Sequence, residues 1–361
     1  MRLNPGLHVV HAGGGILQIG TGGRALLLQD CDDRMADLME RLTVGVPDGH
    51  ELSAALDCGL ALGAAQPLLG LLRRVLVPLG PSAGSFVGHA QDLLADDQAA
   101  AWARSHGVSE RTESAERPSP ELLVQRRGEA TVQVIGLGRT GAALAQVLAS
   151  AGIGQLLLHD PQPVTVADLG TAYRSADLGR VRSVALSRRL DPEERGLLAW
   201  PTATSGPVEL QGDLTVAVSR GAVDRGLIAE ARASDHPVLT VVARDDDLLV
   251  GPWALPSSAG CPECWELDAA GRDLPGVDRY EALARDRAGW EETSMAAAAG
   301  ALAAAQVLAR VDEPGAEPGQ VGTMHRFTGD GHVQSRPVSP HEDCACAWNT
   351  ALLAHSSAHP S

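Results

Sequence analysis

The chain has no lysine. All 29 basic residues are arginine, against 45 acidic residues, so the formal net charge is -16 at pH 7. A lysine Schiff base is therefore excluded, and any contact to phosphate must come from arginine or from backbone N–H groups. Aromatic residues make up only 3% of the chain, which disfavours base stacking. Together with the acidic charge, this argues against nucleic acid as a partner.

Long apolar runs are also missing. No stretch of about 18 consecutive apolar residues occurs, and the first residues, Met1 to Pro5, lack the apolar segment of a signal peptide. We therefore expect a cytoplasmic protein without a membrane partner. With 361 residues, 44% of them hydrophobic, the chain is long enough for roughly two or three domains.

Only six cysteines are present, and four of them form two close pairs in the C-terminal part of the chain. The pairs are Cys261-Pro-Glu-Cys264 and Cys344-Ala-Cys346. Such pairs are typical of a structural Zn²⁺ with four thiolate ligands and no open position for catalysis. A redox-active pair, disulfides and buried thiols are the alternatives, and His341 is an alternative to one thiolate ligand. Cys31 and Cys58 are expected to be buried or incidental thiols.

Residues 1–80 have the pattern of a small α+β domain. Short apolar segments between glycine-rich turns, such as Ile16–Ile19 and Ala25–Leu28, predict an antiparallel sheet. Three helices are expected after the sheet, and their predicted starts are Asp32 or Asp33, His50–Glu51, and Gln66, the last helix reaching Leu76. Three strands and three helices in this length suggest a winged helix.

The charge of this domain disfavours DNA, because residues 1–80 contain six arginines and eight acidic residues. A peptide is the more plausible partner, added as a strand to an exposed strand beside an apolar helix. The residues assigned to the strand edge are Ala25, Leu26, Leu27 and Leu28. Those assigned to the cleft wall are Leu69, Leu72, Val75 and Leu76. For each of these residues taken singly, a place in the domain's own core is the alternative.

Residues 81–130 shift in composition towards Ser, Gly, Glu, Arg and Pro. This composition predicts a linker, with one helical segment from about Ala90 to Ala103.

Residues 131–361 begin with a nucleotide-binding pattern. Thr131–Ile135 predicts a buried strand that leads through a glycine loop into an alanine-rich helix, and the next strand ends in an acidic residue. Such a loop can offer N–H groups to phosphate, and such an acidic residue can bind a ribose hydroxyl. The candidate nucleotide-binding residues from this pattern are Gly136, Gly138, Gly141 and Asp160.

These motifs, the stretch Asp177–Arg182 and the cysteine pairs resemble the ThiF-type, ubiquitin-activating-enzyme-like adenylating family, over Thr131–Trp348. The resemblance implies a Rossmann-like domain with a zinc site of four cysteine ligands, and ATP with Mg²⁺ as cofactors of active members. It also implies that Arg174 lies at the nucleotide, and that Arg182 or Arg180 replaces a phosphate-binding lysine.

The sequence departs from this family after the predicted strand Asp213–Val218. Active members have there an aspartate that binds Mg²⁺, whereas this chain has Arg220. A cation removes the ligand and repels the ion, so adenylation is not expected unless Asp224 substitutes for the missing carboxylate.

A narrower resemblance concerns Val250–Pro252, Cys261–Leu267 and His341–Trp348. These segments resemble the ThiF-like partner proteins of azoline-forming cyclodehydratases, which belong to the biosynthesis of thiazole/oxazole-modified, bacteriocin-like peptides. In that family an N-terminal winged-helix-like α+β domain binds the leader of a ribosomal precursor peptide. The ThiF-like body then hands the core peptide to a separate YcaO-type enzyme.

The resemblance therefore implies a non-catalytic, leader-binding adaptor, and a homodimer is expected. The main alternative is an active ATP-dependent adenylating enzyme that acts on the C-terminal carboxylate of a peptide or carrier. A nicotinamide-dependent enzyme is a third possibility, which the glycine loop and Asp160 favour but which leaves the cysteines unexplained.

Overall fold

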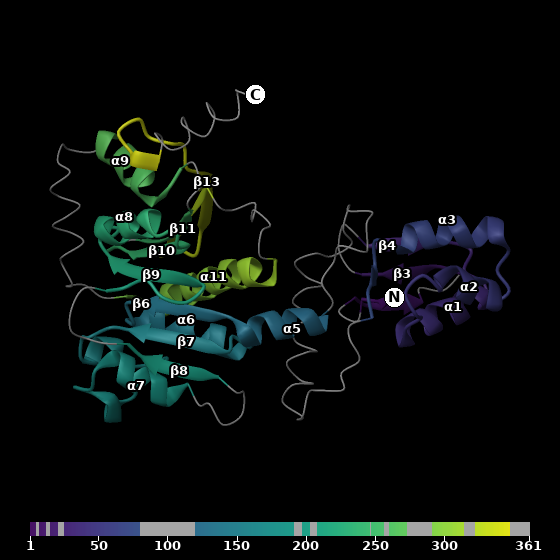
Figure 1. The fold of residues 1–361 in the computed structure, drawn as a ribbon, viewed down its shortest axis with the longest axis horizontal. Coiled ribbons are helices and arrows are strands. Elements are labelled where there is room, and N and C mark those ends of the chain that lie inside the picture. Colours follow the sequence, from purple (N-terminus) through teal and green to yellow (C-terminus); the bar gives the residue numbers. More distant parts are fainter. Residues whose placement is uncertain are drawn as a thin grey trace. The chain divides into compact units, whose positions relative to one another are not determined.

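The computed structural model describes residues 1–4, 7–11, 15–20, 25–79, 120–190, 197–202, 208–245, 247–255, 260–272, 291–313 and 322–346. The chain divides into two compact units, Met1–Arg126 and Arg127–Ser361, and each is described by itself (Figure 1). The helical segment expected near Ala90–Ala103 lies outside the described residues, as does Trp348. The finer division into 1–80, 81–130 and 131–361 stays a prediction.

The first unit combines short strands with three consecutive helices. Its elements are β1 (Arg2–Leu3), β2 (Val9–His11), β3 (Leu17–Ile19), β4 (Leu26–Leu28), α1 (Asp33–Val44), α2 (Glu51–Asp57), α3 (Leu62–Leu72) and β5 (Leu76–Val77), and α5 (Pro120–Glu129) contains the boundary to the second unit. Strands β2, β3 and β4 form an antiparallel sheet in that order, and β1 pairs with β5.

Local sequence signals explain the start of α1. The Asp32 side chain caps the helix by accepting a hydrogen bond from the Met35 N–H at 3.0 Å. Leu38, Met39 and Leu42 lie on its buried face, as the spacing of the apolar residues predicts.

The third helix differs from its prediction. It begins at Leu62 and ends at Leu72, so Leu76 is not helical. Leu76 instead pairs with Leu3 in the β1–β5 ladder and is 2% exposed. Pairing with a distant strand therefore outweighs the local helical preference of this apolar run.

The second unit is built around one large sheet. Its elements are β6 (Thr131–Ile135), α6 (Arg139–Ser150), β7 (Gln155–His159), η3 (Val166–Asp168), η4 (Ser175–Asp177), α7 (Arg182–Arg189), β8 (Leu198–Pro201), β9 (Leu214–Arg220), α8 (Arg225–Ala233), β10 (Val238–Ala243), β11 (Asp247–Ala254), α9 (Pro262–Arg272), α11 (Thr293–Asp312), β12 (Thr323–Thr328) and β13 (Val333–Pro337). The strand order is β13-β12-β11-β10-β9-β6-β7-β8. Strands β10, β9, β6, β7 and β8 are parallel, and β11 to β13 extend the sheet in antiparallel fashion.

Helix α11 packs closely against α6 (Figure 1). Gly300 permits this approach, because a Cβ there would lie 2.9 Å from the Leu144 backbone nitrogen. By length and composition, α11 is the one helix among the described residues that could cross a membrane. Its Ala299, Ala303 and Val307 are fully buried in the core of the unit, so packing inside the protein accounts for its apolar composition.

The order of the strands defines where a ligand can bind. Strand β6 has β7 on one side and β9 on the other, so the chain reverses the direction in which it adds strands at β6. In open parallel sheets, ligands bind beyond the carboxyl ends of the strands at such a switch point. The glycine loop after β6 and the end of β9 both lie there.

Candidate functional site

The glycine loop after β6 is formed by close backbone contacts. Gly136 has φ of 84°, and a Cβ there would lie 2.1 Å from the Val218 carbonyl oxygen in β9. A Cβ at Gly141 would lie 1.9 Å from the Gly136 carbonyl oxygen. Only glycine fits at these two positions. The close packing of β6, α6 and β9 therefore explains both glycines without a bound nucleotide.

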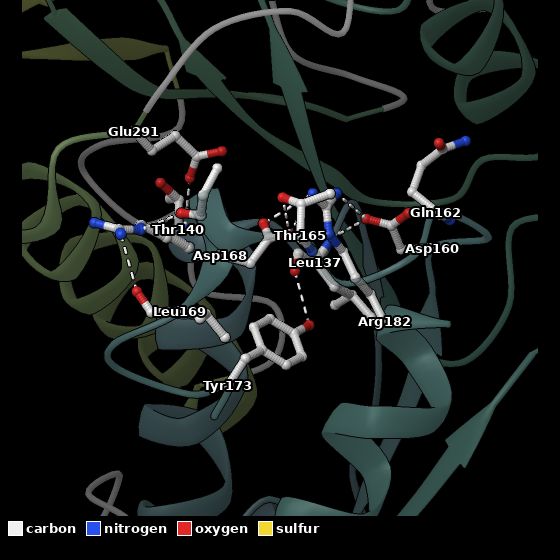
Figure 2. A network of polar contacts seen from close by, with 12 residues as sticks. Leu137, Thr140, Asp160, Gln162, Thr165, Asp168, Leu169, Tyr173, Arg182 and Glu291 are labelled. Atoms are coloured by element: carbon white, nitrogen blue, oxygen red, sulfur yellow. Dashed lines mark hydrogen bonds and ion pairs between the residues drawn. The ribbon is translucent and has the colours of Figure 1, made fainter. Parts of the chain in front are cut away.

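Asp160, at the end of β7, is buried and its oxygens are already engaged (Figure 2). One oxygen accepts a hydrogen bond from the Leu137 N–H at 2.8 Å and pairs with Arg182 at 3.2 Å, and the other accepts from the Gln162 N–H at 2.9 Å. The Arg182 guanidinium also binds Asp168 at 2.8 Å. Asp160, the predicted ligand of a ribose hydroxyl, and Arg182, a predicted phosphate ligand, thus lie together and form an ion pair with each other.

The network stabilises the protonated, positively charged form of Arg182. Burial by itself lowers the pKa of the Arg182 guanidinium, but the charge of Asp160 and the hydrogen bond and charge of Asp168 outweigh it, so the net pKa is raised. Arg174 lies elsewhere: its side chain is exposed, and its backbone N–H donates to Asp177 at 2.9 Å at the start of η4.

Two residues that the sequence pattern did not single out hold the loop in place. Tyr173 is 1% exposed and donates from its hydroxyl to the Leu137 carbonyl oxygen at 2.8 Å. Burial raises the pKa of Tyr173, assisted by the charge of Asp160, so the phenol stays a neutral donor. Arg139 donates to the carbonyl oxygens of Ala167 at 2.6 Å and Leu169 at 2.9 Å.

Arg220 ends β9 and forms an ion pair with Glu291 at 2.9 Å. The other carboxylate oxygen of Glu291 accepts a hydrogen bond from the Thr140 N–H at 2.7 Å, in the first turn of α6 (Figure 2). Asp224, the alternative Mg²⁺ ligand, instead caps α8 by accepting from the Leu227 N–H at 3.1 Å. The end of β9 therefore carries an arginine–carboxylate pair.

The four paired cysteines converge in the second unit. Their sulfur atoms all lie within 4.8 Å of one another, and every one of the four residues is buried. The Sγ atom of Cys261 lies 3.8 Å from that of Cys264 and 3.5 Å from that of Cys344. Thiolates at the corners of a tetrahedron, about 2.3 Å from a central ion, lie about 3.8 Å apart. The cluster therefore fits a tetrahedral metal ion.

The surroundings of the cluster agree with four sulfur ligands. His341 approaches it through its backbone N–H, which donates to Cys264 at 3.3 Å, whereas its ring nitrogen Nδ1 accepts from the Asp343 N–H at 3.2 Å. The ring is thus engaged away from the sulfurs. Cys31 and Cys58 are half-buried in the first unit.

Arg232 on α8 is a further part of the cluster, and no local sequence pattern points to it. Its guanidinium donates to Cys261 at 2.7 Å and to Cys344 at 3.4 Å. Burial lowers its pKa, but the charges of Cys261 and Cys344 and the hydrogen bond to Glu263 outweigh this and raise it. A fixed cation beside the sulfurs stabilises their thiolate form, which is the form that binds metal.

Some candidate peptide-binding residues of the first unit lie in strand β4 at the edge of a sheet, and others lie in the hydrophobic core of the unit. Strand β4 is at the end of its sheet, and within the described residues no strand pairs with its outer side. Leu26 and Leu28 are buried, Ala25 is half-buried, and Leu27 is 58% exposed.

Of the residues assigned to the cleft wall, only Leu69 is half-buried. Leu72, Val75 and Leu76 are at most 2% exposed and pack in the core of the unit. These three residues are therefore core residues of the first unit, and they cannot form the wall of an open cleft.

The parallel strands of the mixed sheet and the glycine loop at its switch point define a Rossmann-like α/β fold. The ThiF family model matches residues 117–192. This match confirms the resemblance to the ThiF-type family within the matched segment. Over 63 residues, 17% of this chain, it is 38% identical to ubiquitin-activating enzyme E1 1 of Candida albicans (strain WO-1). The matched segment is 6% of the length of that relative.

Similar folds, extending over most of this chain, are found among solved structures. Escherichia coli MccB has a TM-score of 0.69 at 18% identity, with 96% of both chains covered. The complex of E. coli MccB with AMPCPP and MccA has a TM-score of 0.67 at 17% identity, covering 96% of this chain and 98% of that chain. PaaA has a TM-score of 0.64 at 15% identity, covering 93% and 99%. At these identities the likeness establishes the fold.

Proposed function

We propose that the protein is a non-catalytic adaptor that binds the leader of a ribosomal precursor peptide and delivers the peptide to a YcaO-type cyclodehydratase, in the biosynthesis of thiazole/oxazole-modified peptides. The observation that carries this proposal is Arg220 at the end of β9, ion-paired with Glu291. Mg²⁺ needs oxygen ligands at its site, and a guanidinium there offers none and repels the ion. A ThiF-type body with this substitution is suited to holding a peptide and lacks the means to activate one.

Strand β4 supports peptide capture. Its side chains alternate, with Leu26 and Leu28 in the core and Leu27 exposed, so the strand is anchored from one face only. The outer edge of such a strand offers backbone N–H and C=O groups to an added strand. In this proposal residues 1–80 are a winged-helix-like leader-binding domain, and the chain acts as a homodimer beside its YcaO-type partner.

The metal of the cysteine cluster is proposed to be Zn²⁺ with a structural role. Four thiolates in a tetrahedral arrangement are the donor set that zinc prefers, and they complete its coordination. The ion would join the start of α9 to the segment after β13, and Arg232 would offset part of the negative charge of a zinc–tetrathiolate centre.

Adenylation of a peptide or carrier carboxylate is the second candidate function. It is favoured by the likeness to MccB, which extends over 96% of both chains. Solved structures of that protein include complexes with ATP and with N-formylated MccA, and it is described as a microcin C7 biosynthetic enzyme. The intact glycine loop is compatible with this alternative.

Fluorescence anisotropy tests peptide capture. The probes are labelled synthetic peptides that correspond to short precursor-like genes beside the gene for this protein. Leu27→Asp should weaken binding of the leader segment by at least about tenfold, because it places a charge on the proposed docking edge. Leu56→Asp is the matched control, since Leu56 is a leucine of α2 that is 43% exposed.

Unchanged affinity of Leu27→Asp would remove β4 as the docking edge. If the wild-type protein binds no leader segment at all, the adaptor proposal fails. Peptide-dependent exchange of pyrophosphate into ATP would instead establish the second candidate.

A further inference from the structure

The Glu291 carboxylate lies where an anionic ligand of the glycine loop would bind. It accepts from the Thr140 N–H at 2.7 Å, and this group is one of the N–H donors that the first turn of a helix leaves without a helical partner. A Cβ built on Gly138 would lie 2.6 Å from Glu291 Oε1. The carboxylate therefore fills the space that the glycine leaves open beside the backbone.

The surroundings of this carboxylate are those of a built-in anion site. Helix α6 has 12 residues and its N-terminus favours negative charge. The Glu291 side chain is 4% exposed, and Arg220 supplies the counter-charge at 2.9 Å. The hydroxyl of Thr140 is fully buried beside it and has no hydrogen-bond partner among the described residues.

The two charged residues compensate each other. Arg220 is the last residue of β9, and the Glu291 carboxylate lies at the N-terminus of α6. The Glu291 carboxylate would be unfavourable in this buried place without a counter-charge. Arg220 supplies a counter-charge without a metal ion or a nucleotide.

We propose that Glu291 is an intramolecular substitute for a nucleotide phosphate, which closes the glycine loop and excludes nucleoside triphosphates. A polyphosphate in the loop would compete for the Thr140 N–H and for Arg220, and it would meet a buried carboxylate of the same charge. Nucleotide binding and the Glu291–Arg220 pair therefore exclude each other. This inference rests on the non-catalytic part of the proposed function and is independent of peptide capture.

Isothermal titration calorimetry of the full chain with ATP, with and without Mg²⁺, tests the closure. The wild-type protein should give no measurable binding, whereas Glu291→Ala should bind ATP at least about tenfold more tightly than the detection limit, because it frees the Thr140 N–H and removes a buried negative charge. Glu291→Gln should gain affinity in the same direction. Glu209→Gln is the charge-matched control, since Glu209 is exposed, and it should behave as the wild type.

Two outcomes overturn the inference. One is ATP binding by the wild-type protein, and the other is a Glu291→Ala variant that is folded by circular dichroism and still binds no ATP. If that variant does not fold, hydrogen exchange of the wild-type Thr140 amide decides. Its protection should be unchanged by added ATP, and a change overturns the closure. Leader-peptide anisotropy on the same samples reports separately on the adaptor proposal.

Discussion

Loss of the metal site should unfold or strongly destabilise the second unit. The four cysteines that form the site are all buried, and the sulfur atoms lie within 4.8 Å of one another. Structural Zn²⁺ contributes about 10 to 16 kcal/mol of apparent binding free energy in zinc-finger peptides, which is as large as the roughly 5 to 15 kcal/mol by which a typical domain is stable. If only about 4 kcal/mol of this is realised, Tm falls by roughly 8 to 16 °C for a unit of about 150 to 250 residues.

The assay combines metal analysis with thermal unfolding. Purified protein should contain one zinc ion per chain, and Cys264→Ser should lose the metal and show the predicted drop in Tm by circular dichroism. Cys58→Ser is the matched control, because Cys58 is a half-buried cysteine of the first unit, and it should keep both zinc and Tm. Protein that is purified without any metal, together with an unchanged Tm for Cys264→Ser, would show that the cysteine cluster is not a structural metal site.

Two further predictions concern ion pairs of two buried carboxylates in the second unit, Asp312 and Asp247. Asp312→Asn leaves the Arg127 guanidinium, which is 4% exposed, without its counter-charge, and should cost about 3 to 5 kcal/mol in urea denaturation; a loss below about 1 kcal/mol would contradict this. Burial raises the pKa of Asp247, but hydrogen bonds from Arg244 and Arg326 lower it more, to below its ordinary 3.8. The stabilisation by Asp247 is therefore fully present above pH 3.8 and is lost as pH falls through the lower folded-state pKa. Asp247→Asn should remove this part of the acid dependence of Tm, and an unchanged pH profile would count against the pair.

Local patterns were sufficient for the glycine loop and the strand before it. Five residues, Thr131–Ile135, form β6 as the apolar run predicts. The cysteine pairs, although far apart in the sequence, come together as their spacing indicates, because thiolates in pairs are a strong signal of a common ion.

Contacts between segments that are far apart in the sequence could not be predicted from local patterns. Glu291 reaches Arg220 and Thr140 from a different part of the chain, and nothing in the residues around it distinguishes it from a surface glutamate. The same holds for Arg232 at the cysteine cluster. The apolar neighbours of Leu76 predict a helix, whereas Leu76 pairs with strand β1 at the start of the chain.

ATP–pyrophosphate exchange shows whether this ThiF-like protein activates the peptide that it is proposed to bind. The assay uses the full chain with Mg²⁺, ATP, labelled pyrophosphate and the precursor-like peptide that binds in the anisotropy experiment. If Arg220 stands in place of a metal-binding carboxylate and Glu291 closes the glycine loop, as we propose from their ion pair and from the contact of Glu291 with Gly138, label incorporation into ATP should equal the background without protein. Robust incorporation that depends on the peptide would contradict the account.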